Sequence, residues 1–368
     1  MNFLCDKDEF INGLNTVAKA LSSKPSIPVF EGIYMECYDN KVKLIASNGQ
    51  LTIETFVSAD TKVEGRVLVP GRLFIEIVKK CYDGDIECLV EEPTTINIFS
   101  GKSKAKISTL DVTYFPIIDT KEEEWKVTLN NRVLKDMVRG SIFAAAGENA
   151  SKPILTGLYC TCEDGSLSFV TIDGYRMAIK NTSVTASNGN VIVPSKAMDE
   201  IAKTISDDDE EETTLYVNEK YLKAVNDKTT IISTLINGEY VKYKDILPEK
   251  SEVKIKVRRN DLASAIERAS IVSRVKKDNL LVLNIDKDSL SITAKSECGD
   301  IYDEIDIWQE GGPLRIGFNG NYLNDAFKNI NDEYVYMEFN SEISPCVIKP
   351  CEGNGFTYLV LPVRISNN

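Results

Sequence analysis

The side chains that could do chemistry in this chain are carboxylates and thiols, because the sequence contains no histidine. Without imidazole, the commonest general base and metal ligand is missing, and no Ser-His or Cys-His dyad can form. Six consecutive acids at residues 207–212 could attract a cation. Calcium loops, however, place acids at alternating positions around a glycine, and contiguous like charges usually form a solvated loop. We expect such a loop here, and no metal site.

Two shorter patterns also suggest chemistry. Cys160 and Cys162 share one face of a predicted strand, but without a third thiol or a histidine nearby a core role is favoured. A carboxylate-based hydrolase could use a pair such as Asp303 and Glu304. Adjacent strand residues point to opposite faces, however, so these two carboxylates cannot flank one substrate. The hydrolase is kept as an alternative from another function class.

Nucleotide chemistry is not indicated. The GKS at residues 101–103 has Ile96 where a P-loop needs its first glycine, and no GxGxxG occurs. We therefore predict that the chain is not an enzyme and uses no cofactor.

The elements that must position these residues belong to a long, well-mixed chain. Its 368 residues, 43% hydrophobic and 27% charged, exceed one ordinary core and predict two or three domains. No signal-peptide pattern and no run of about 18 apolar residues occurs, which predicts a cytoplasmic protein without a membrane partner. The nine cysteines are odd in number and form no CxxC pair, so we expect reduced core thiols.

Internal repetition is the most informative feature. An acidic turn between two alternating apolar segments occurs at residues 35–47, 159–171 and 283–295, where Val42, Leu167 and Leu290 correspond at spacings of 125 and 123 residues. A second pattern, which places Pro70, Pro194 and Asn319 in register, repeats at 124 and 125 residues. Two independent patterns with one period predict three tandem repeats.

Each repeat is predicted to contain two helices and two sets of strands. Apolar residues at helical spacing open each repeat, and a second helix follows the first strands at about 71–81, 195–205 and 320–330. Further alternating segments follow each second helix. The fold class is therefore α+β, with three repeats of a doubled helix-plus-antiparallel-sheet unit. Charged segments at 121–125 and 248–252 predict domains at residues 1–122, 123–250 and 251–368.

The net charge of −13 seems to argue against nucleic acid, but the charge is unevenly distributed. The predicted helices with their flanks carry +8, which leaves −21 for the rest of the chain. If the helices share one surface, that surface is relatively basic within an acidic body.

These segments together resemble the DNA polymerase III beta subunit family, the bacterial sliding clamps, over essentially the whole chain. The resemblance rests on KPSIPVFEGI (24–33), LVPGRLF (68–74), YFPII (114–118), VTIDGYRMA (170–178), VIVPSKAM (191–198), YKDILP (243–248), LRIGFNGNYLNDAF (314–327) and YLVLPVRI (358–365). Several are weak singly, but their order on three repeats is specific.

The resemblance implies a head-to-tail ring of two chains with helices lining a central hole. Duplex DNA would be retained topologically and without sequence readout, while lining cations make weak contacts to phosphates. The implied partners are duplex DNA, a second copy of the chain, the replicative DNA polymerase, a clamp loader and other proteins with a clamp-binding motif. The implied DNA-facing residues are Lys24, Arg72, Lys79, Asn149, Lys152 and Lys196.

Ring closure is argued from charge. The strand at 101–107 carries alternating lysines in the first domain, and residues 297–306 of the third domain are acidic, so a basic edge could pair with an acidic edge. The resemblance adds Ile271 and Val272 as an apolar plug packed near Ile107. The predicted interface comprises Lys102, Lys104, Ile107, Ile271, Val272, Glu297, Asp300 and Glu304.

A peptide pocket between the second and third domains is also implied, where polymerases and other clamp users dock a short motif. Matching positions are Leu155, Ile172, Gly174, Tyr175, Arg176, Met177, Val241, Ile246, Asn319, Tyr322, Ile343, Pro345, Leu361, Pro362, Val363 and Arg364. An adaptable apolar floor and arginines at the rim suit peptide binding.

The chain departs from the family pattern at a few of these positions. Tyr175 stands where the family often has histidine, and Val241 where proline is common, which predicts an altered pocket rim. Lys102 and Lys104 stand where arginines are common, so charge is kept but bidentate geometry is lost. The alternative function is a three-repeat interaction scaffold that never encircles DNA.

Overall fold

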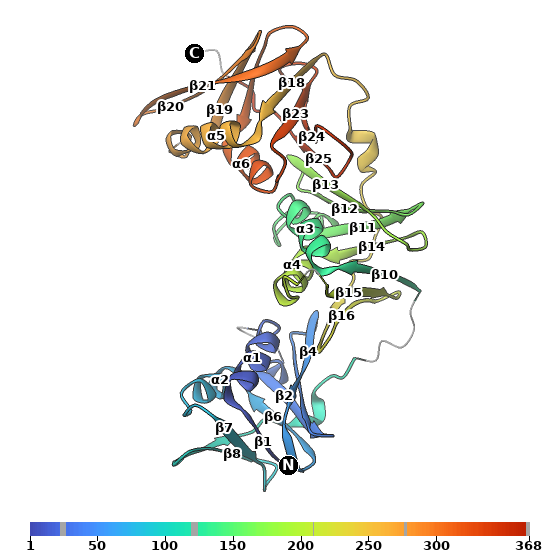
Figure 1. The fold of residues 1–368 in the computed structure, drawn as a ribbon, viewed down its shortest axis with the longest axis vertical. Coiled ribbons are helices and arrows are strands. Elements are labelled where there is room, and N and C mark those ends of the chain that lie inside the picture. The colour runs from blue at the N-terminus through green and yellow to red at the C-terminus, as the bar shows by residue number, and fades with distance from the viewer. Residues whose placement is uncertain (23–26, 119–123, 209, 276–277, 366–368) are drawn as a thin grey trace. The chain divides into compact units, whose positions relative to one another are not determined.

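The computed structural model describes residues 1–22, 27–118, 124–208, 210–275 and 278–365. The chain forms two compact units, each of two segments: unit 1 is Met1–Arg132 with Glu200–Leu235, and unit 2 is Val133–Asp199 with Ile236–Asn368. Figure 1 shows their elements along the chain. The division runs through residues 123–250, which the sequence pattern groups as a central domain.

Unit 1 holds two antiparallel sheets. A five-stranded sheet has the order β5-β1-β7-β8-β9, and an eight-stranded sheet has the order β10-β15-β16-β17-β4-β3-β2-β6. The strands are β1 (Asn2–Asp6), β2 (Gly32–Tyr38), β3 (Lys41–Ser47), β4 (Leu51–Ser58), β5 (Asp60–Val63), β6 (Gly65–Pro70), β7 (Asp85–Leu89), β8 (Thr95–Ser100), β9 (Ser103–Ser108), β10 (Trp125–Asn130), β15 (Glu212–Val217), β16 (Tyr221–Asn226) and β17 (Thr229–Thr234).

Unit 2 holds one twelve-stranded antiparallel sheet with the order β14-β11-β12-β13-β25-β24-β23-β18-β21-β20-β19-β22. Its strands are β11 (Gly157–Glu163), β12 (Ser166–Ile172), β13 (Arg176–Ser183), β14 (Gly189–Pro194), β18 (Val253–Arg258), β19 (Leu280–Asp286), β20 (Ser289–Ser296), β21 (Gly299–Glu310), β22 (Leu314–Asn319), β23 (Tyr334–Phe339), β24 (Cys346–Pro350) and β25 (Phe356–Val360).

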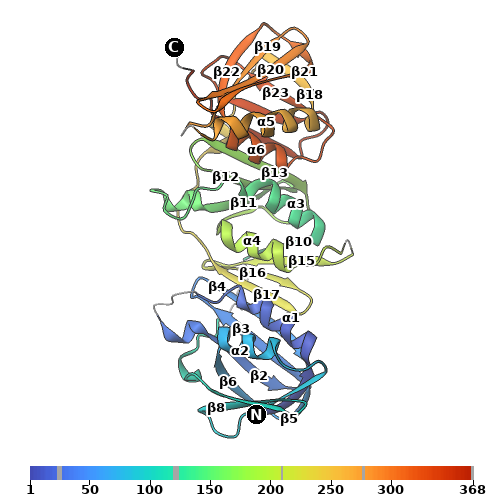
Figure 2. The ribbon, with the colours of Figure 1, turned by 90° about the vertical axis from the view of Figure 1, so that its left-hand side faces the viewer.

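The helices occur at the predicted places. They are α1 (Lys7–Ala18), α2 (Gly71–Lys79), α3 (Asn131–Ile142), α4 (Ser195–Thr204), α5 (Arg259–Ser273) and α6 (Gly320–Lys328), with short 3-10 turns η1 (Pro28–Glu31), η2 (Val112–Tyr114), η3 (Pro153–Thr156) and η4 (Tyr243–Ile246). Asp6 caps α1 by accepting hydrogen bonds from the backbone N–H groups of Asp8 and Glu9. α1 and α2 contact each other in unit 1, and α5 and α6 do so in unit 2 (Figure 2).

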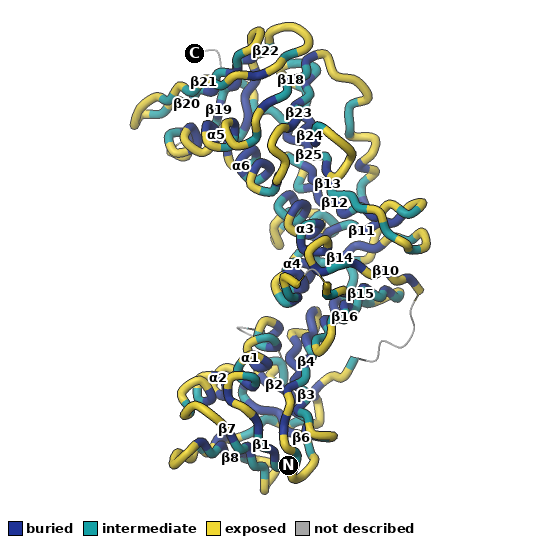
Figure 3. The backbone as a smooth tube through the Cα atoms, in the orientation of Figure 1, coloured by how far each residue is buried: buried dark blue, intermediate teal, exposed yellow. Residues whose placement is uncertain are grey.

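Each helix buries one apolar stripe against a sheet. In α1, Phe10, Leu14 and Val17 are fully buried at the i, i+4, i+7 spacing of one helix face. In unit 2, α5 contributes Leu262 and Ile266 to a core shared with β19, β20 and β22. Figure 3 shows that buried residues are concentrated in the helices and strands of each unit, while many of the connecting loops are exposed.

The acidic turns are hairpin turns, as the repeats predict. Asp39 and Asn40 both have positive φ between β2 and β3, and Asp164 with Gly165 does so between β11 and β12. Asp, Asn and Gly accept this conformation, which matches the twist of the flanking strands.

Strand pairing crosses the repeat boundaries within both units. In unit 1, β17 pairs with β4, where Ile231 lies opposite Ile53. In unit 2, β13 pairs with β25, where Met177 lies opposite Leu359. These pairings join neighbouring repeats into continuous sheets, so compact units and sequence repeats have different limits.

Most of the cysteines are buried, unpaired thiols, as expected. All nine cysteines are unpaired, and Cys160 and Cys162 are buried, but Cys298 is exposed in the turn between β20 and β21 and is not a core thiol. Among the residues that the structure describes, no cluster of His, Cys, Asp and Glu could hold a metal ion. Over the same residues, no helix combines the length and apolar character needed to cross a bilayer.

Candidate functional site

The predicted DNA-facing residues lie on helices or on the loop that follows α3. Arg72 is exposed in the first turn of α2, and Lys79 is exposed in its last turn. Lys196 lies in the first turn of α4 and forms an ion pair with Glu148, which precedes the exposed Asn149. Lys152 is exposed just before η3. Lys24 lies outside the described residues.

Two further lysines share the position of Lys79 in their own repeats. Lys203 lies in the last turn of α4 and Lys328 in the last turn of α6, each exposed. A lysine there also interacts favourably with the carbonyl end of its helix. Sequence reasoning missed this pair, although aligning the repeats through Pro70, Pro194 and Asn319 would have found it.

The lysine-rich strand is a free edge. β9 pairs with β8 and has no second neighbour strand among the described residues. Lys104 and Lys106 are exposed on it, and Lys102 is exposed in the turn before it. The Lys104 ammonium lies 5.1 Å from the centre of the Phe99 ring, within the range of a cation–π contact.

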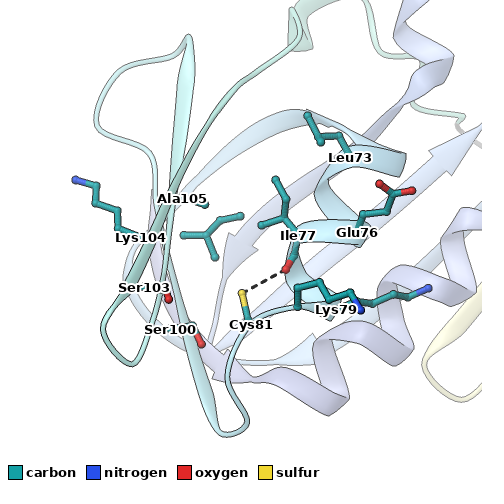
Figure 4. Close-up of a pocket in the computed structure, with 11 residues that line it drawn as sticks. Leu73, Glu76, Ile77, Lys79, Cys81, Ser100, Ser103, Lys104 and Ala105 are labelled. Atoms are coloured by element: carbon teal, nitrogen blue, oxygen red, sulfur yellow. Dashed lines mark hydrogen bonds between the residues drawn. The ribbon is translucent and has the colours of Figure 1, made fainter.

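A pocket of about 550 Å³ lies beside this edge, between α2 and strands β8 and β9 (Figure 4). Its apolar lining comes from Leu73, Ile77, Ile98 and Ala105, with Lys79, Lys80 and Lys104 among the polar residues that complete it. The Cys81 thiol lies in the pocket and donates to the Ile77 carbonyl oxygen at 3.5 Å. Burial raises the pKa of this thiol.

Ile107, near which the apolar plug is predicted to pack, is buried with 5% exposure. Its neighbour Ala105 lies two residues away on the same face of β9 and lines the pocket. Sequence reasoning named Lys79 and Lys104 of this pocket for other roles, and it did not name the apolar residues that line it.

The acidic segment also lies on a free edge. β21 pairs with β20 from Gly299 to Asp306, and with β18 only from Ile307 to Glu310. The first part of β21 therefore has no second neighbour among the described residues, and Figure 1 shows the β20–β21 hairpin extending beyond the other strands of unit 2. Glu297, Asp300 and Glu304 are all exposed there.

Two anchors hold this acidic edge. Arg268 of α5 binds the Asp303 carboxylate in bidentate fashion, at 3.0 Å from Nε and 2.8 Å from Nη2. Glu304 accepts hydrogen bonds from Tyr302 at 2.6 Å and from Ser289 at 2.7 Å. The Tyr302 and Ser289 hydroxyls lower the pKa of Glu304, so it is held ionised. Asp303 and Glu304 thus have separate partners, as expected for adjacent strand residues.

The predicted plug lies on the same helix as Arg268. Ile271 is 67% exposed, which is unusual for isoleucine, and Val272 packs partly against the unit 2 core. One end of unit 2 therefore presents an apolar side chain beside an acidic edge.

The residues predicted for the peptide pocket all belong to unit 2. Ile172 and Met177 are buried in one apolar cluster, and Leu155, Val241 and Leu361 pack partly buried against it. Ile343 and Ile246 are exposed at 70% and 40%. Gly174, with φ of 94°, has open space where a side chain would start.

Arg176 is held by two carboxylates of the chain itself. Its Nε lies 3.0 Å from Asp173, and its Nη1 donates at 2.5 Å to Asp325 of α6. The guanidinium also lies 4.7 Å from the Tyr322 ring centre. Arg176 therefore connects β13 to α6 from a largely buried position, whereas Arg364 is exposed.

Tyr175 is 60% exposed and stacks on Tyr322, with ring centres 6.0 Å apart and an interplanar angle of 21°. The residue that departs from the family pattern thus forms an aromatic pair with a second predicted pocket residue. The last pocket residues run beside it, where the Leu361 N–H donates to the Tyr175 carbonyl oxygen at 2.9 Å. Asn319 caps α6 by accepting from the Asn321 N–H, and Pro345 and Pro362 are half-buried.

Comparison with known proteins decides the family. Models of the DNA polymerase III beta subunit match in succession, with the N-terminal domain over residues 1–119, the central domain over 128–242 and the C-terminal domain over 244–364. The beta sliding clamp of Staphylococcus epidermidis is 30% identical over 376 residues, covering 99% of both chains. This chain belongs to the beta sliding clamp family.

Solved beta sliding clamps share the fold. The sliding clamp from Bacillus subtilis has a TM-score of 0.96 at 26% identity and covers 100% of both chains. A putative DNA polymerase III beta subunit from Eubacterium rectale has a TM-score of 0.95 at 28% identity, covering 99% of this chain and 100% of its own. The expected three-repeat α+β clamp fold is confirmed.

Membership of the beta sliding clamp family also decides between function classes. A beta sliding clamp is a non-catalytic processivity factor of DNA polymerase, so the prediction that the chain is not an enzyme is confirmed and the hydrolase alternative is wrong. The scaffold alternative is not favoured, because the relatives and the solved structures are sliding clamps.

Proposed function

We propose that two copies of this chain close head to tail into a ring around duplex DNA and tether the replicative polymerase to it. The same ring would be opened by a clamp loader and shared with other proteins that carry a clamp-binding motif. We assign the domains as residues 1–122, 123–250 and 251–368, and the location as the cytoplasm. The observation that carries this proposal is the pair of complementary free edges at β9 and β21.

The two edges suit a heterologous contact. β9 is basic and lies beside an apolar pocket, while the first part of β21 is acidic and lies on the same unit as the exposed Ile271. A β9 edge of one copy and a β21 edge of the next would complete each other's hydrogen bonds and pair opposite charges. Ile271 would then enter the partner's pocket. Two such contacts use both edges of both copies, so the assembly ends at a dimer.

Retention on DNA would come from enclosure. Arg72, Lys79 and Lys196 are exposed cations on helices, which suits weak contacts to phosphates and no base readout. The ion pair with Glu148 further weakens the contact that Lys196 could make to a phosphate. A ring of this kind slides because no contact is strong.

The topological claim is tested by cutting the DNA. The chain would be loaded onto a nicked circular plasmid by the clamp loader of the same organism with ATP, and then separated by gel filtration. We expect the chain to elute with the circle and to be lost once the plasmid is linearised. Retention on the linear product, or no retention on the circle with an active loader, would contradict enclosure.

Charge reversal tests the lining. Changing Lys24, Arg72 and Lys196 to glutamate together is expected to lower the loaded fraction on the order of tenfold at moderate salt, because phosphate contacts and their counterion release are lost. The measurement is the amount of chain on the nicked circle after loading, with circular dichroism to verify folding.

The matched control changes three exposed lysines on strands and turns to glutamate: Lys126, Lys220 and Lys287. This variant has the same net charge as the first but keeps the helix cations, so we expect loading close to that of the unmodified chain. Equal loading by both triple variants would remove the helix residues from the lining.

A further inference from the structure

The last described residues form a strap along the peptide pocket. Residues 361–365, called the C-terminal strap below, follow β25 and are half-buried except for the exposed Arg364. Two backbone N–H groups hold the strap: that of Leu361 donates to Tyr175 at 2.9 Å, and that of Val363 donates to Gly317 at 2.8 Å. Pro362 between them has no N–H to contribute.

Gly317 lies in the middle of β22, where the backbone conformation does not require glycine. Its φ is not among the positive values of the chain, so other residues could adopt this backbone. A Cβ atom built there would lie 2.7 Å from the Val363 carbonyl oxygen and 3.0 Å from the Ile365 Cγ1 atom. It would also lie 2.8 Å from the Leu280 Cδ1 atom, which is the movable end of a side chain. The rigid obstacle is the strap backbone, so glycine is needed for close approach.

We propose that Gly317 is a positioning residue of the peptide pocket, because its missing side chain lets the C-terminal strap pair with β22. Gly317 does not contact the partner peptide. It acts through the strap, which carries Leu361, Pro362, Val363 and Arg364 along the pocket. This inference rests on the proposed peptide-tethering function and adds how the outer wall of that pocket is held.

The consequence is a pocket whose wall depends on two backbone hydrogen bonds. The inner cluster around Met177 is held by sheet pairing, and Leu361 at the start of the strap packs against its edge. Displacing the strap would therefore leave the inner floor in place and misalign the wall. Partner affinity should fall while the unit remains folded.

The central test is Gly317→Ala. The probe is the tightest binder among overlapping synthetic peptides from the replicative polymerase of the same organism, labelled with fluorescein. Affinity for the probe is expected to fall about tenfold, since the added methyl group forces the strap out of register. Hydrogen exchange of residues 361–365 should become faster at the same time.

The matched control is Gly312→Ala. Gly312 also lacks a positive φ, lies in the same unit and has nothing within 4 Å of a built Cβ atom. Its variant should bind the probe as the unmodified chain does. A loss equal to that of Gly317→Ala would show a general glycine effect and overturn the inference.

A second variant, Val363→Pro, removes the strap N–H without adding volume at β22. It should also lower the affinity for the probe about tenfold. If Gly317→Ala does not fold, this variant provides the test instead. The double variant separates a shared mechanism from two independent ones. We expect it to bind about as weakly as either single variant, and a loss near a hundredfold would contradict action through the strap.

The outcomes also separate this inference from the function beneath it. If no polymerase peptide binds the unmodified chain, the tethering function fails. If the probe binds the unmodified chain and both single variants equally, tethering stands and the role of Gly317 is refuted.

Discussion

Replacing Ile271 and Val272 with alanine is expected to convert the ring dimer into monomers. Ile271 is 67% exposed in the single chain, so its apolar surface becomes buried only if a partner covers it. Full burial of such a side chain contributes about 1.5–3 kcal/mol. Losing most of this at two adjacent residues weakens each of the two ring contacts roughly a thousandfold.

Sedimentation equilibrium over a range of concentrations measures this change directly. Val272 packs partly against the unit 2 core, so thermal unfolding must be followed to separate lost folding from lost pairing. The matched control is Ile343→Ala, because Ile343 is 70% exposed on the same unit and lies in the predicted peptide pocket. An unshifted dimer mass for the double variant would remove α5 from the interface.

Deleting residues 363–368 is expected to abolish binding of the polymerase while leaving the dimer intact. The deletion removes the Val363 hydrogen bond to Gly317 and the outer apolar wall of the pocket. It does not touch β9, β21 or Ile271, which carry the proposed ring contact. The affinity for the labelled polymerase peptide should fall at least a hundredfold, because the deletion removes the outer side chains of the pocket and also the hydrogen bond that positions the remaining strap.

The control for this deletion removes residues 366–368 alone and keeps the C-terminal strap. It should bind the peptide as the unmodified chain does. Full affinity in the longer deletion would refute the pocket assignment, whereas loss of the dimer in that variant would mean that the deletion reaches the ring interface.

Local features of the sequence predicted the elements well. Helix positions followed from apolar residues such as Phe10, Leu14 and Val17, because helical spacing is a property of neighbouring residues. The hairpin at Asp39 and Asn40 followed from turn chemistry in the same way. Repetition of both patterns at one period then determined the fold class.

Partner choice over long distances could not be predicted in this way. Arg176 was predicted at the pocket rim, and the structure adds that it binds Asp325, which is 149 residues away in the chain. Ile107 was predicted to lie near the apolar plug, and the structure adds that Ile98 and Ala105 line the pocket beside it. A strand pattern shows which residues share a face, but not which of two faces a neighbouring helix covers.

The sequence by itself determined three helix-and-sheet repeats and the absence of histidine chemistry, because periodicity and composition are local properties of the chain. Its short motifs, taken in order, added the resemblance to sliding clamps. Only the tertiary structure decided that half of β21 is left as a free edge, that a pocket opens beside β9, and that Gly317 is glycine to admit the C-terminal strap. Each of these depends on which distant segments approach within a few ångströms, and that is decided by packing of the whole unit.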